Sequence, residues 1–324
     1  MKALDLIGAI ELAYDRTNDE KTWLAEITRF VATAFGSPNV GPVTSFVFDL
    51  SDEHIRLGTT TGVGSLRYER DDFERQHDVG RRYGPVHRAY ECDIYTLLSR
   101  AVGPKEAKES IVAAGMIGED AVGLRANATP RSGIILTTQV PAGHRLRNRE
   151  LWTRFAAHLG AALRMRRLKA APSPSSALAV LLPNGRLEHG NRDTIAAQAP
   201  LGSAAKAIDR ARGKLRRLDP EAAAALWRTM VREEWSLVDW YDHDGKRFLL
   251  AQENRIPTRS KDTLTPREEQ VVACAAMGHS NKLIAYDLGL SIGSVAVLLG
   301  RAARRLGVCG RVALVRAFKE SYRT

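Results

Sequence analysis

Capping signals divide the C-terminal part of the chain into short helices. Thr265 is suited to cap a helix, with Pro266 at the first helical position and Glu268 placed to close a capping box. The helix that they open is predicted to end at Gly278, because glycine readily adopts the left-handed conformation that terminates helices. Ser280 is suited to cap a second helix. These residues indicate where the chain turns before any packing is considered.

A tight turn joins this second helix to a third. The second helix is predicted to end at Gly289, and residues 289–291 form the turn. The helix beyond it has apolar residues at helical spacing, namely Val295, Leu298, Leu299, Ala302 and Leu306. Two short helices joined by a glycine turn are typical of the DNA-binding helix-turn-helix, whose second helix enters the major groove.

These residues resemble the DNA-binding domain of LuxR-type (GerE-like) transcription regulators. The resemblance covers residues 259–324 without gaps and rests on Leu264–Glu268, Gly278, Ser280–Lys282, Ile284, Ala285, Leu288, Ser291, Val295 and Arg305–Gly307. It implies a module of four helices in which the third reads double-stranded DNA. It also implies that the last helix, Arg311–Tyr322, often pairs two copies through Leu314, Val315, Phe318 and Tyr322, so a homodimer is expected.

Three positions depart from the family pattern. Leu283 stands where the family often has glutamate, and Ala296 stands where a lysine normally meets DNA. Gly300 takes the groove-facing position one turn later. The outward face of the third helix is therefore expected to hold Ser294, Val297, Gly300, Arg301 and Arg304.

The candidate DNA contacts follow from the chemistry of these side chains. Val297 can contact a thymine methyl group, and Arg301 can bind guanine through two hydrogen bonds. Phosphate contacts, which position a protein on DNA without reading its sequence, are expected from Lys282, Ser291, Ser294, Arg304 and Arg305. The alternative for each arginine is a solvated surface charge with no part in binding.

The net charge of +11 is concentrated in two segments. Residues 259–324 hold eleven Lys or Arg and five Asp or Glu, a net charge of +6. Residues 145–169 hold eight and one, a net charge of +7, which leaves −2 for the rest of the chain. This distribution predicts contact with a polyanion at defined places. For residues 145–169, the alternative is the exposed face of a structural helix.

The length of 324 residues predicts two or three domains. No apolar run approaches the ~18 residues that a membrane span needs. Asp5 and Glu11 interrupt the N-terminal segment, which therefore does not have the pattern of a signal peptide. The three cysteines, Cys92, Cys274 and Cys309, are scattered and fit a reducing cytoplasm.

The part of the chain before residue 259 is predicted to be α+β. Residues 1–169 combine helices over 3–16, 20–36, 95–101 and 146–168 with strands over 43–50, 54–61, 121–128 and 133–140, and residues 68–88 are predicted as helix with loops. In element order and length this segment resembles a GAF-like sensory or dimerisation domain.

A second α+β segment follows a linker over residues 170–176. Residues 177–253 carry hairpins over 177–189 and 235–252, which enclose an interrupted helix over 193–217 and a helix capped by Asp219 that includes Trp227, Met230 and Val231. The order resembles a PAS-like domain. A second linker, residues 254–261, leads into the helix-turn-helix domain at residues 259–324.

Motifs for catalysis or cofactor binding are missing from the sequence. His77, His87, Cys92 and Asp93 lie near one another, but their spacing matches no recurring zinc pattern. There is no phosphate-binding loop and no nucleophile elbow with a Ser-His-Asp order. The sequence therefore predicts neither an enzyme nor a bound cofactor or metal.

The leading hypothesis is a cytoplasmic, DNA-binding transcription regulator with sensory domains at residues 1–169 and 177–253. It would bind DNA as a homodimer and respond to a small molecule or a protein, without a membrane partner. One alternative is a regulator whose helix-turn-helix binds protein instead of DNA, because Ala296 and Gly300 remove usual contacts. Another is an enzyme in the front half with a DNA-binding tail.

Overall fold

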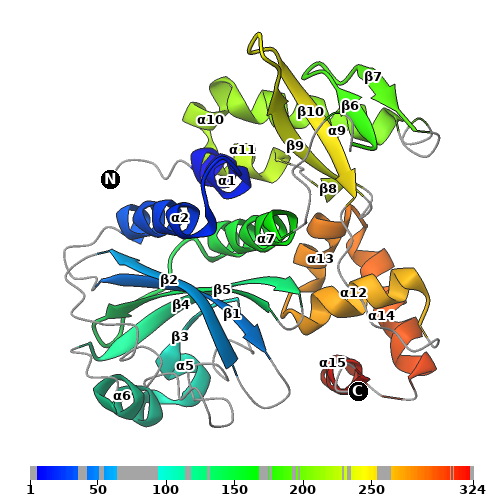
Figure 1. The fold of residues 1–324 in the computed structure, drawn as a ribbon. Coiled ribbons are helices and arrows are strands. Elements are labelled where there is room, and N and C mark those ends of the chain that lie inside the picture. The colour runs from blue at the N-terminus through cyan, green and yellow to red at the C-terminus, as the bar shows by residue number, and fades with distance from the viewer. Residues whose placement is uncertain are drawn as a thin grey trace.

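The structure is a computed structural model with an α+β architecture (Figure 1). Two five-stranded sheets enclose a layer of helices, and a domain made of helices stands beside them at the C-terminal end. The structure describes residues 6–35, 42–50, 55–63, 94–113, 118–129, 132–167, 174, 177–191, 195, 198–227, 230–231, 235–253, 264–306, 308 and 310–321.

The first sheet is antiparallel, with the strand order β2-β1-β5-β4-β3. Its strands are β1 (Val43–Leu50), β2 (Ile55–Val63), β3 (Tyr95–Leu97), β4 (Asp120–Thr129) and β5 (Ser132–Val140). Alternate residues of β4, namely Val122, Leu124, Ala126 and Ala128, are buried in the main hydrophobic cluster.

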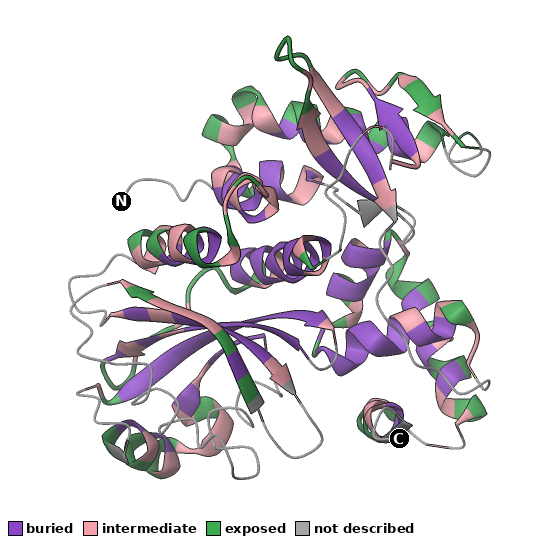
Figure 2. Cartoon of the chain, in the orientation of Figure 1, coloured by how far each residue is buried: buried purple, intermediate pink, exposed green. Residues whose placement is uncertain are grey.

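Helices cover the face of the first sheet on which this cluster lies. They are α2 (Glu20–Phe35) and α7 (Arg149–Arg166), and α1 (Leu6–Tyr14) packs on these two helices, whereas α5 (Leu98–Val102) and α6 (Pro104–Ala113) pack beside β4 (Figure 1). Helix α7 is enclosed on several sides and contacts α1, β4, β5 and two helices that come later in the chain (Figure 2).

Gly160 allows α7 to lie close to β4. A Cβ atom at this position would come within 2.3 Å of the backbone oxygen of Asn127, a distance that real Cβ atoms do not show. The close approach therefore requires glycine for reasons of space, in the middle of a helix where glycine otherwise weakens the helix.

The second sheet is also antiparallel, with the order β7-β6-β10-β9-β8. Its strands are β6 (Ala179–Leu181), β7 (Leu187–Gly190), β8 (Met230–Val231), β9 (Trp235–Tyr241) and β10 (Arg247–Glu253), and its helices are α9 (Gln198–Arg212), α10 (Lys214–Leu218) and α11 (Pro220–Leu226). Asp219 caps α11 through Ala222 N at 2.9 Å, as the sequence predicts.

The two sheets have the same topology. If each set of five strands is counted in chain order, the spatial order is 2-1-5-4-3 in both sheets. Each sheet therefore begins with a hairpin at one edge and receives its last strand in the middle. The sequence has no repeat of fixed period, so this likeness becomes visible in the structure alone.

Arg212 joins the two sheet-containing parts of the chain. It contacts Glu11 of α1 (Nε to Oε1, 2.5 Å) and Asp239 of β9 (Nη1 to Oδ1, 2.9 Å). Its guanidinium also lies over the Trp227 ring, 4.7 Å from the centroid. Helix α11 packs on α1 and α7, so one hydrophobic cluster runs from the first sheet into the second.

The structure corrects some sequence predictions about secondary structure. The helix expected over residues 95–101 begins as strand β3, because Tyr95–Leu97 pair with β4, and α6 was not predicted. Met230 and Val231 form strand β8 at the edge of the sheet instead of continuing a helix, because they pair with β9. Both errors involve strand pairing, which the apolar spacing of one short segment does not reveal. The segment over residues 68–88 and both linkers, apart from residue 174, lie outside the described residues.

The last four helices form a separate cluster of buried residues. They are α12 (Pro266–Ala276), α13 (Asn281–Leu288), α14 (Ile292–Arg305) and α15 (Gly310–Ser321). Within the described part of the chain, no single helix has the length and apolar composition to cross a membrane, and the pair α13 and α14, which passes that test jointly, is bent by 106° at its junction.

Candidate nucleic-acid interface

The start of α12 is held by the predicted capping box. Thr265 Oγ1 accepts a hydrogen bond from Glu268 N at 3.3 Å, and Glu268 Oε2 accepts one from Thr265 N at 2.9 Å. Burial of Glu268 raises its pKa, but the hydrogen bonds from Thr265 and the nearby Arg305 outweigh this, so the net pKa lies below the usual value. Arg305 of α14 contacts the same carboxylate at 3.1 Å and thereby ties α14 to the start of α12.

The turn between α13 and α14 also follows the sequence prediction. Ser280 Oγ caps α13 by accepting from Leu283 N at 3.2 Å, and Gly289 ends the helix with φ of 64°. Ser291 Oγ caps α14 by accepting from Ser294 N at 3.0 Å. Two helices meeting at 106° over a short glycine turn have the geometry of a helix-turn-helix.

One side of α14 packs into the domain and the other is open to solvent. Val295, Leu299 and Ala302 are buried against α12, α13 and α15. The exposed residues of the helix include Ile292, Gly293, Ser294, Ala296, Val297, Gly300, Arg301 and Arg304. Helix α14 lies on the outer side of the domain, away from both sheets (Figure 1).

The charges of this domain are sorted by sign. The acids Glu268, Glu269 and Asp287 are at most 7% exposed, and Asp287 is paired with His279 at 2.6 Å. Arg301 and Arg304, in contrast, are exposed on α14. Arg301 has no ion-pair partner among the described residues, and Arg304 Nε donates to its own helix at Gly300 O, 3.3 Å away. The outer face therefore presents positive charge.

Comparison with protein-family models identifies the same part of the chain as the helix-turn-helix. Residues 262–318 match the model described as "Bacterial regulatory proteins, luxR family". These residues form a LuxR-family domain. A search of curated proteins gave no match. Among solved structures, "SdiA in complex with octanoyl-rac-glycerol" aligns over 99% of this chain and 96% of its own, with 9% identity and a TM-score of 0.29, which is too low to indicate a shared overall arrangement.

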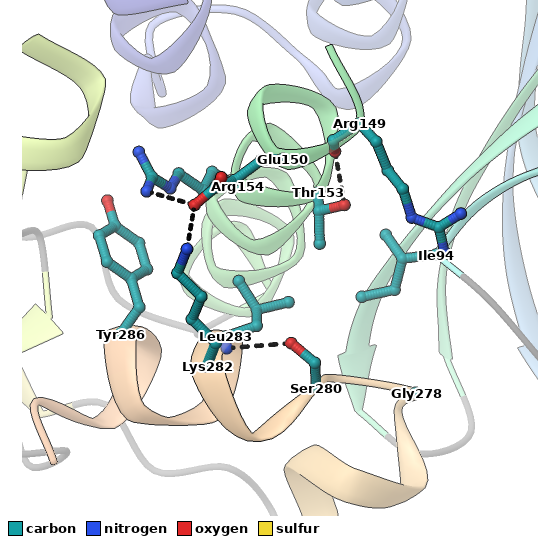
Figure 3. A pocket seen from close by; sticks show the side chains of 10 residues that line it. All are labelled: Ile94, Arg149, Glu150, Thr153, Arg154, Gly278, Ser280, Lys282, Leu283 and Tyr286. Carbon is teal, nitrogen blue, oxygen red and sulfur yellow. Dashed lines mark hydrogen bonds and ion pairs between the residues drawn. The ribbon is translucent and has the colours of Figure 1, made fainter. Parts of the chain in front are cut away.

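The predicted contact residues do not all lie on one surface of the LuxR-family domain. Ser294, Ala296, Val297, Gly300, Arg301 and Arg304 share the exposed side of α14, and Ser291 lies at its start. Arg305 is about half exposed and bound to Glu268. Lys282 lies on α13, where it faces the rest of the protein instead of continuing the surface of α14 (Figure 3).

Lys282 forms an ion pair with the first sheet-containing part of the chain. Its Nζ atom lies 2.8 Å from Oε1 of Glu150, which also accepts from Arg154 Nη2 at 2.8 Å (Figure 3). The hydrogen bond from Lys282 lowers the pKa of Glu150 below its usual value. This contact bridges a cavity of about 420 Å³ between the first turns of α7 and α13.

Tyr286 of α13 is the central residue of the contact between the LuxR-family domain and the rest of the chain. Its hydroxyl donates to Trp227 O at 2.5 Å, beside Ala224 O at 3.2 Å, at the end of α11. The same oxygen lies 3.1 Å from Nε2 of His158 on α7, whose Nδ1 atom lies 3.3 Å from the Tyr14 hydroxyl. Tyr286 therefore contacts both sheet-containing parts at once.

His158 is neutral in this arrangement. Burial, and to a smaller extent the positive charge of Arg154, lowers the pKa of His158 to about 3. A neutral ring has one donor and one acceptor. Because Tyr286 donates to Trp227, the consistent assignment gives Nε2–H of His158 to Tyr286 and leaves Nδ1 to accept from Tyr14.

The sequence did not identify this contact, although Leu283 was a clue. Leu283 is 5% exposed and belongs to the cluster that runs through the two sheets, not to the core of its own domain. Helix α13 thus has two apolar sides: Ile284, Ala285 and Leu288 face inward, and Leu283 and Tyr286 face α7. A second apolar side on a short surface helix indicates a partner.

Asn127 adds a hydrogen bond from the first sheet. Its Nδ2 atom donates to Met277 O at the end of α12, 2.7 Å away, and the bond is buried. Asn127 is the β4 residue whose backbone lies against Gly160 of α7. The LuxR-family domain is therefore attached to β4, α7 and α11.

The stripe on α15 has a different role from the predicted one. Leu314 and Phe318 are 1% and 2% exposed in the core of the LuxR-family domain, with Val315 packed beside them. Tyr322 lies outside the described residues. The exposed apolar residue of α15 is Val312, at 83%. The predicted pairing stripe is thus largely used inside the domain.

The basic segment over residues 145–169 binds groups of the protein itself at several positions. Arg166 donates to Asn18 O at 2.7 Å and lies over the Trp23 ring, and Arg167 pairs with Asp49 at 2.9 Å. Arg164 donates to Ala128 O at 2.9 Å. These contacts favour the structural alternative for α7. Within the described residues no group of three His, Cys, Asp or Glu is placed to hold a metal, and residues 77–93 lie outside them.

Proposed function

We propose that the protein is a transcription regulator that binds double-stranded DNA through its LuxR-family domain and is controlled by the two sheet-containing parts. The observation that carries the proposal is the sorting of charge around α14. Its outer side is exposed and carries Arg301 and Arg304, whereas Glu268, Glu269 and Asp287 are buried. A positive, accessible second helix of a helix-turn-helix is suited to the major groove.

The proposal assigns the DNA contacts as follows. Arg301 reads a base, and Val297 contacts a thymine methyl group. Ser291, Ser294, Arg304 and Arg305 contact phosphates, with Lys282 joining them once it leaves Glu150. Ala296 and Gly300 contribute small surfaces that let the helix backbone approach the groove. Acting on chromosomal DNA, the protein would work in the bacterial cytoplasm.

We further propose that residues 1–169 are a GAF-like sensory domain, residues 177–253 a PAS-like domain and residues 259–324 the DNA-binding domain. The common 2-1-5-4-3 strand order of the two sheets supports treating them as two units of one topology. A small molecule or a partner protein would act on these units. Their signal would reach the DNA-binding domain through Tyr286, which contacts α7 and the end of α11.

The docked arrangement would hold the protein in its weaker DNA-binding state. Glu150 forms an ion pair with Lys282 and so competes with DNA phosphate for the ammonium group of that lysine. The first helix of a helix-turn-helix crosses the DNA backbone, and here α13 faces α7 instead. A signal that shifts α11 relative to α7 would break the bonds of Tyr286 and release the domain. Two copies would then occupy half-sites about 34–36 Å apart.

Duplex binding by the full-length protein tests the proposal. The affinity for random-sequence duplex should fall steeply with salt, because each phosphate contact contributes about −0.9 to the slope of log K against log salt concentration. Arg304→Ala should reduce that slope by about 1. As a matched control, Arg186→Ala removes an exposed arginine of the second sheet and should leave the slope unchanged. No measurable binding at low salt would refute the DNA-binding role.

One observation favours a second candidate function. Ile292 and Val297 are 53% and 52% exposed on α14, and an apolar surface on a helix is also suited to a protein groove. In that case the domain would regulate transcription by binding another protein. Binding to duplex DNA with little dependence on salt, or none at all, would favour this candidate.

A further inference from the structure

The outermost line of α14 consists of two glycines on either side of a valine. At 100° per residue, Val297 lies opposite the buried Val295, Leu299 and Ala302. Gly293 precedes it by four residues and Gly300 follows it by three, so all three residues share one side of the helix. Of the four surface neighbours of Val297, Gly293 and Gly300 have no side chain, and Ser294 and Arg301 flank it on the other side.

Nothing in the fold of the protein requires these glycines. A Cβ atom at Gly300 would meet nothing within 4 Å, and one at Gly293 would meet the Ser291 hydroxyl at 3.8 Å, an ordinary contact. Neither residue has a positive φ. Gly300 lies in the exposed interior of α14, where glycine weakens a helix relative to alanine, and Gly293 lies in its first turn. Because glycine weakens the helix and no neighbouring atom requires it, we expect another surface to approach the helix closely here.

The polar groups near Val297 offer few hydrogen bonds to a base. The Ser291 and Ser294 hydroxyls lie 2.8 Å apart and bond to each other, and Ser291 Oγ also accepts from Ser294 N. Arg301 and Arg304 lie about one and two turns beyond Val297, and Arg301 is the side chain that can donate to a base edge. The N-terminal half of a reading helix is the half that contacts base edges. In this protein that half is apolar, with Ile292 and Val297 as its large exposed side chains.

We infer that Gly293, Val297 and Gly300 form a close-approach surface that reads the 5-methyl group of a pyrimidine in the major groove. The methyl group of thymine is the apolar feature that the major groove displays, and valine is suited to contact it. The flanking glycines bring the valine within reach by removing side chains that would hold the helix away. The inference rests on the proposed function, which pairs Val297 with a thymine methyl group, and adds that the glycines on either side let the valine reach it.

The experiment begins with selection of duplexes by the full-length protein from a random pool. Each thymine in the selected site is then replaced by deoxyuridine, which lacks the 5-methyl group and keeps the hydrogen-bonding pattern. At one thymine per half-site we expect an affinity loss of about fourfold, which corresponds to about 0.8 kcal/mol for one buried methyl-sized group. In Val297→Ala the same replacement should have no effect, because the contacting side chain is gone.

A second arm tests the glycines. Gly300→Ala should raise the melting temperature, since alanine favours the helix and meets no neighbour, and should lower the affinity for the selected duplex at least threefold. A structural role for Gly300 would change stability and binding in the same direction. Gly213→Ala, which alters an exposed glycine next to α10, is the control for unrelated effects.

The outcomes separate the inference from the function on which it rests. If no duplex is enriched and none is bound, both the proposed function and the inference fail. If a duplex is selected but deoxyuridine changes the affinity less than twofold at every thymine, the inference alone is wrong. Loss of affinity that is equal in the wild type and in Val297→Ala would also overturn it, because another residue would then contact the methyl group.

Discussion

Removal of the Tyr286 hydroxyl is the most direct test of how the LuxR-family domain is held. Tyr286→Phe removes one oxygen and preserves the ring, which packs beside Arg154 and His158. The change leaves the core of the LuxR-family domain intact, because Tyr286 packs against the cluster of the sheets instead. It should therefore weaken docking without unfolding the domain.

The size of the effect can be worked from the contacts that are lost. The bond to Trp227 O, 2.5 Å long, contributes about 1 kcal/mol net. The change also leaves the buried Nε2–H group of His158 without an acceptor, which destabilises the docked state by about 1–3 kcal/mol. At the low end of these values the total is about 2 kcal/mol, which shifts the docking equilibrium roughly 30-fold toward the released state.

Two measurements follow this shift. In a fluorescence anisotropy titration, Tyr286→Phe should bind a selected duplex more tightly, by up to about 30-fold if the docked state predominates in the wild type. Hydrogen exchange should become faster at the α7 and α13 residues that face each other. Tyr241→Phe is the matched control, because Tyr241 is 58% exposed at the end of β9.

The reasoning would be refuted by unchanged exchange across the contact. It would also be refuted if Tyr286→Phe exchanged faster but bound DNA no better, because release would then not control binding. A similar gain in Tyr241→Phe would show that the effect does not arise at this contact.

Other changes test separate parts of the structure. Arg212→Met leaves Glu11 and Asp239 with one fewer partner each and should lower the free energy of unfolding by about 2–3 kcal/mol, measured by urea denaturation, whereas no change would contradict a role in joining the two sheets. Thr265→Ala removes the cap of α12 and should cost about 1 kcal/mol in the same assay, with Thr265→Ser as the conservative control. Docking should weaken as pH falls below about 6.5, because burial holds the pKa of docked His158 at about 3 and release returns it toward 6.5. At pH 5.5 the free energy of docking should be weaker by about 1.4 kcal/mol. The affinity for DNA should therefore rise about tenfold in the wild type and not in His158→Gln.

Local signals explain why the C-terminal domain could be predicted in detail. Thr265, Ser280 and Ser291 act on residues within one turn, and Gly289 acts through its own backbone conformation. None of these interactions depends on distant parts of the chain. The strands β1, β4, β5, β9 and β10 were predicted for a similar reason, because their alternating or continuous apolar patterns are contained in each segment.

The contact between the domains could not be predicted in this way. Tyr286 and His158 are 128 residues apart in the sequence, and Asn127 and Met277 are 150 apart. No pattern of spacing joins such pairs, and Glu150 reads as an ordinary surface carboxylate. The departure at Leu283 was visible, but its meaning depended on α7, which packs against that side of α13. Met230 and Val231 were missed for another reason, since their two-residue strand is too short to show a pattern and exists through pairing with β9, which follows shortly in the sequence.

The missing side chain at Gly160 has a consequence for how movement would pass through the molecule. Asn127 lies with its backbone against Gly160 and its amide on Met277, so helix, strand and DNA-binding domain meet at one residue with no room to spare. Because the backbones of α7 and β4 are in direct contact here, a small displacement of one should move the other. A displacement of β4 should therefore reach the end of α12 through Asn127, and a single methyl group at position 160 would push α7 and β4 apart.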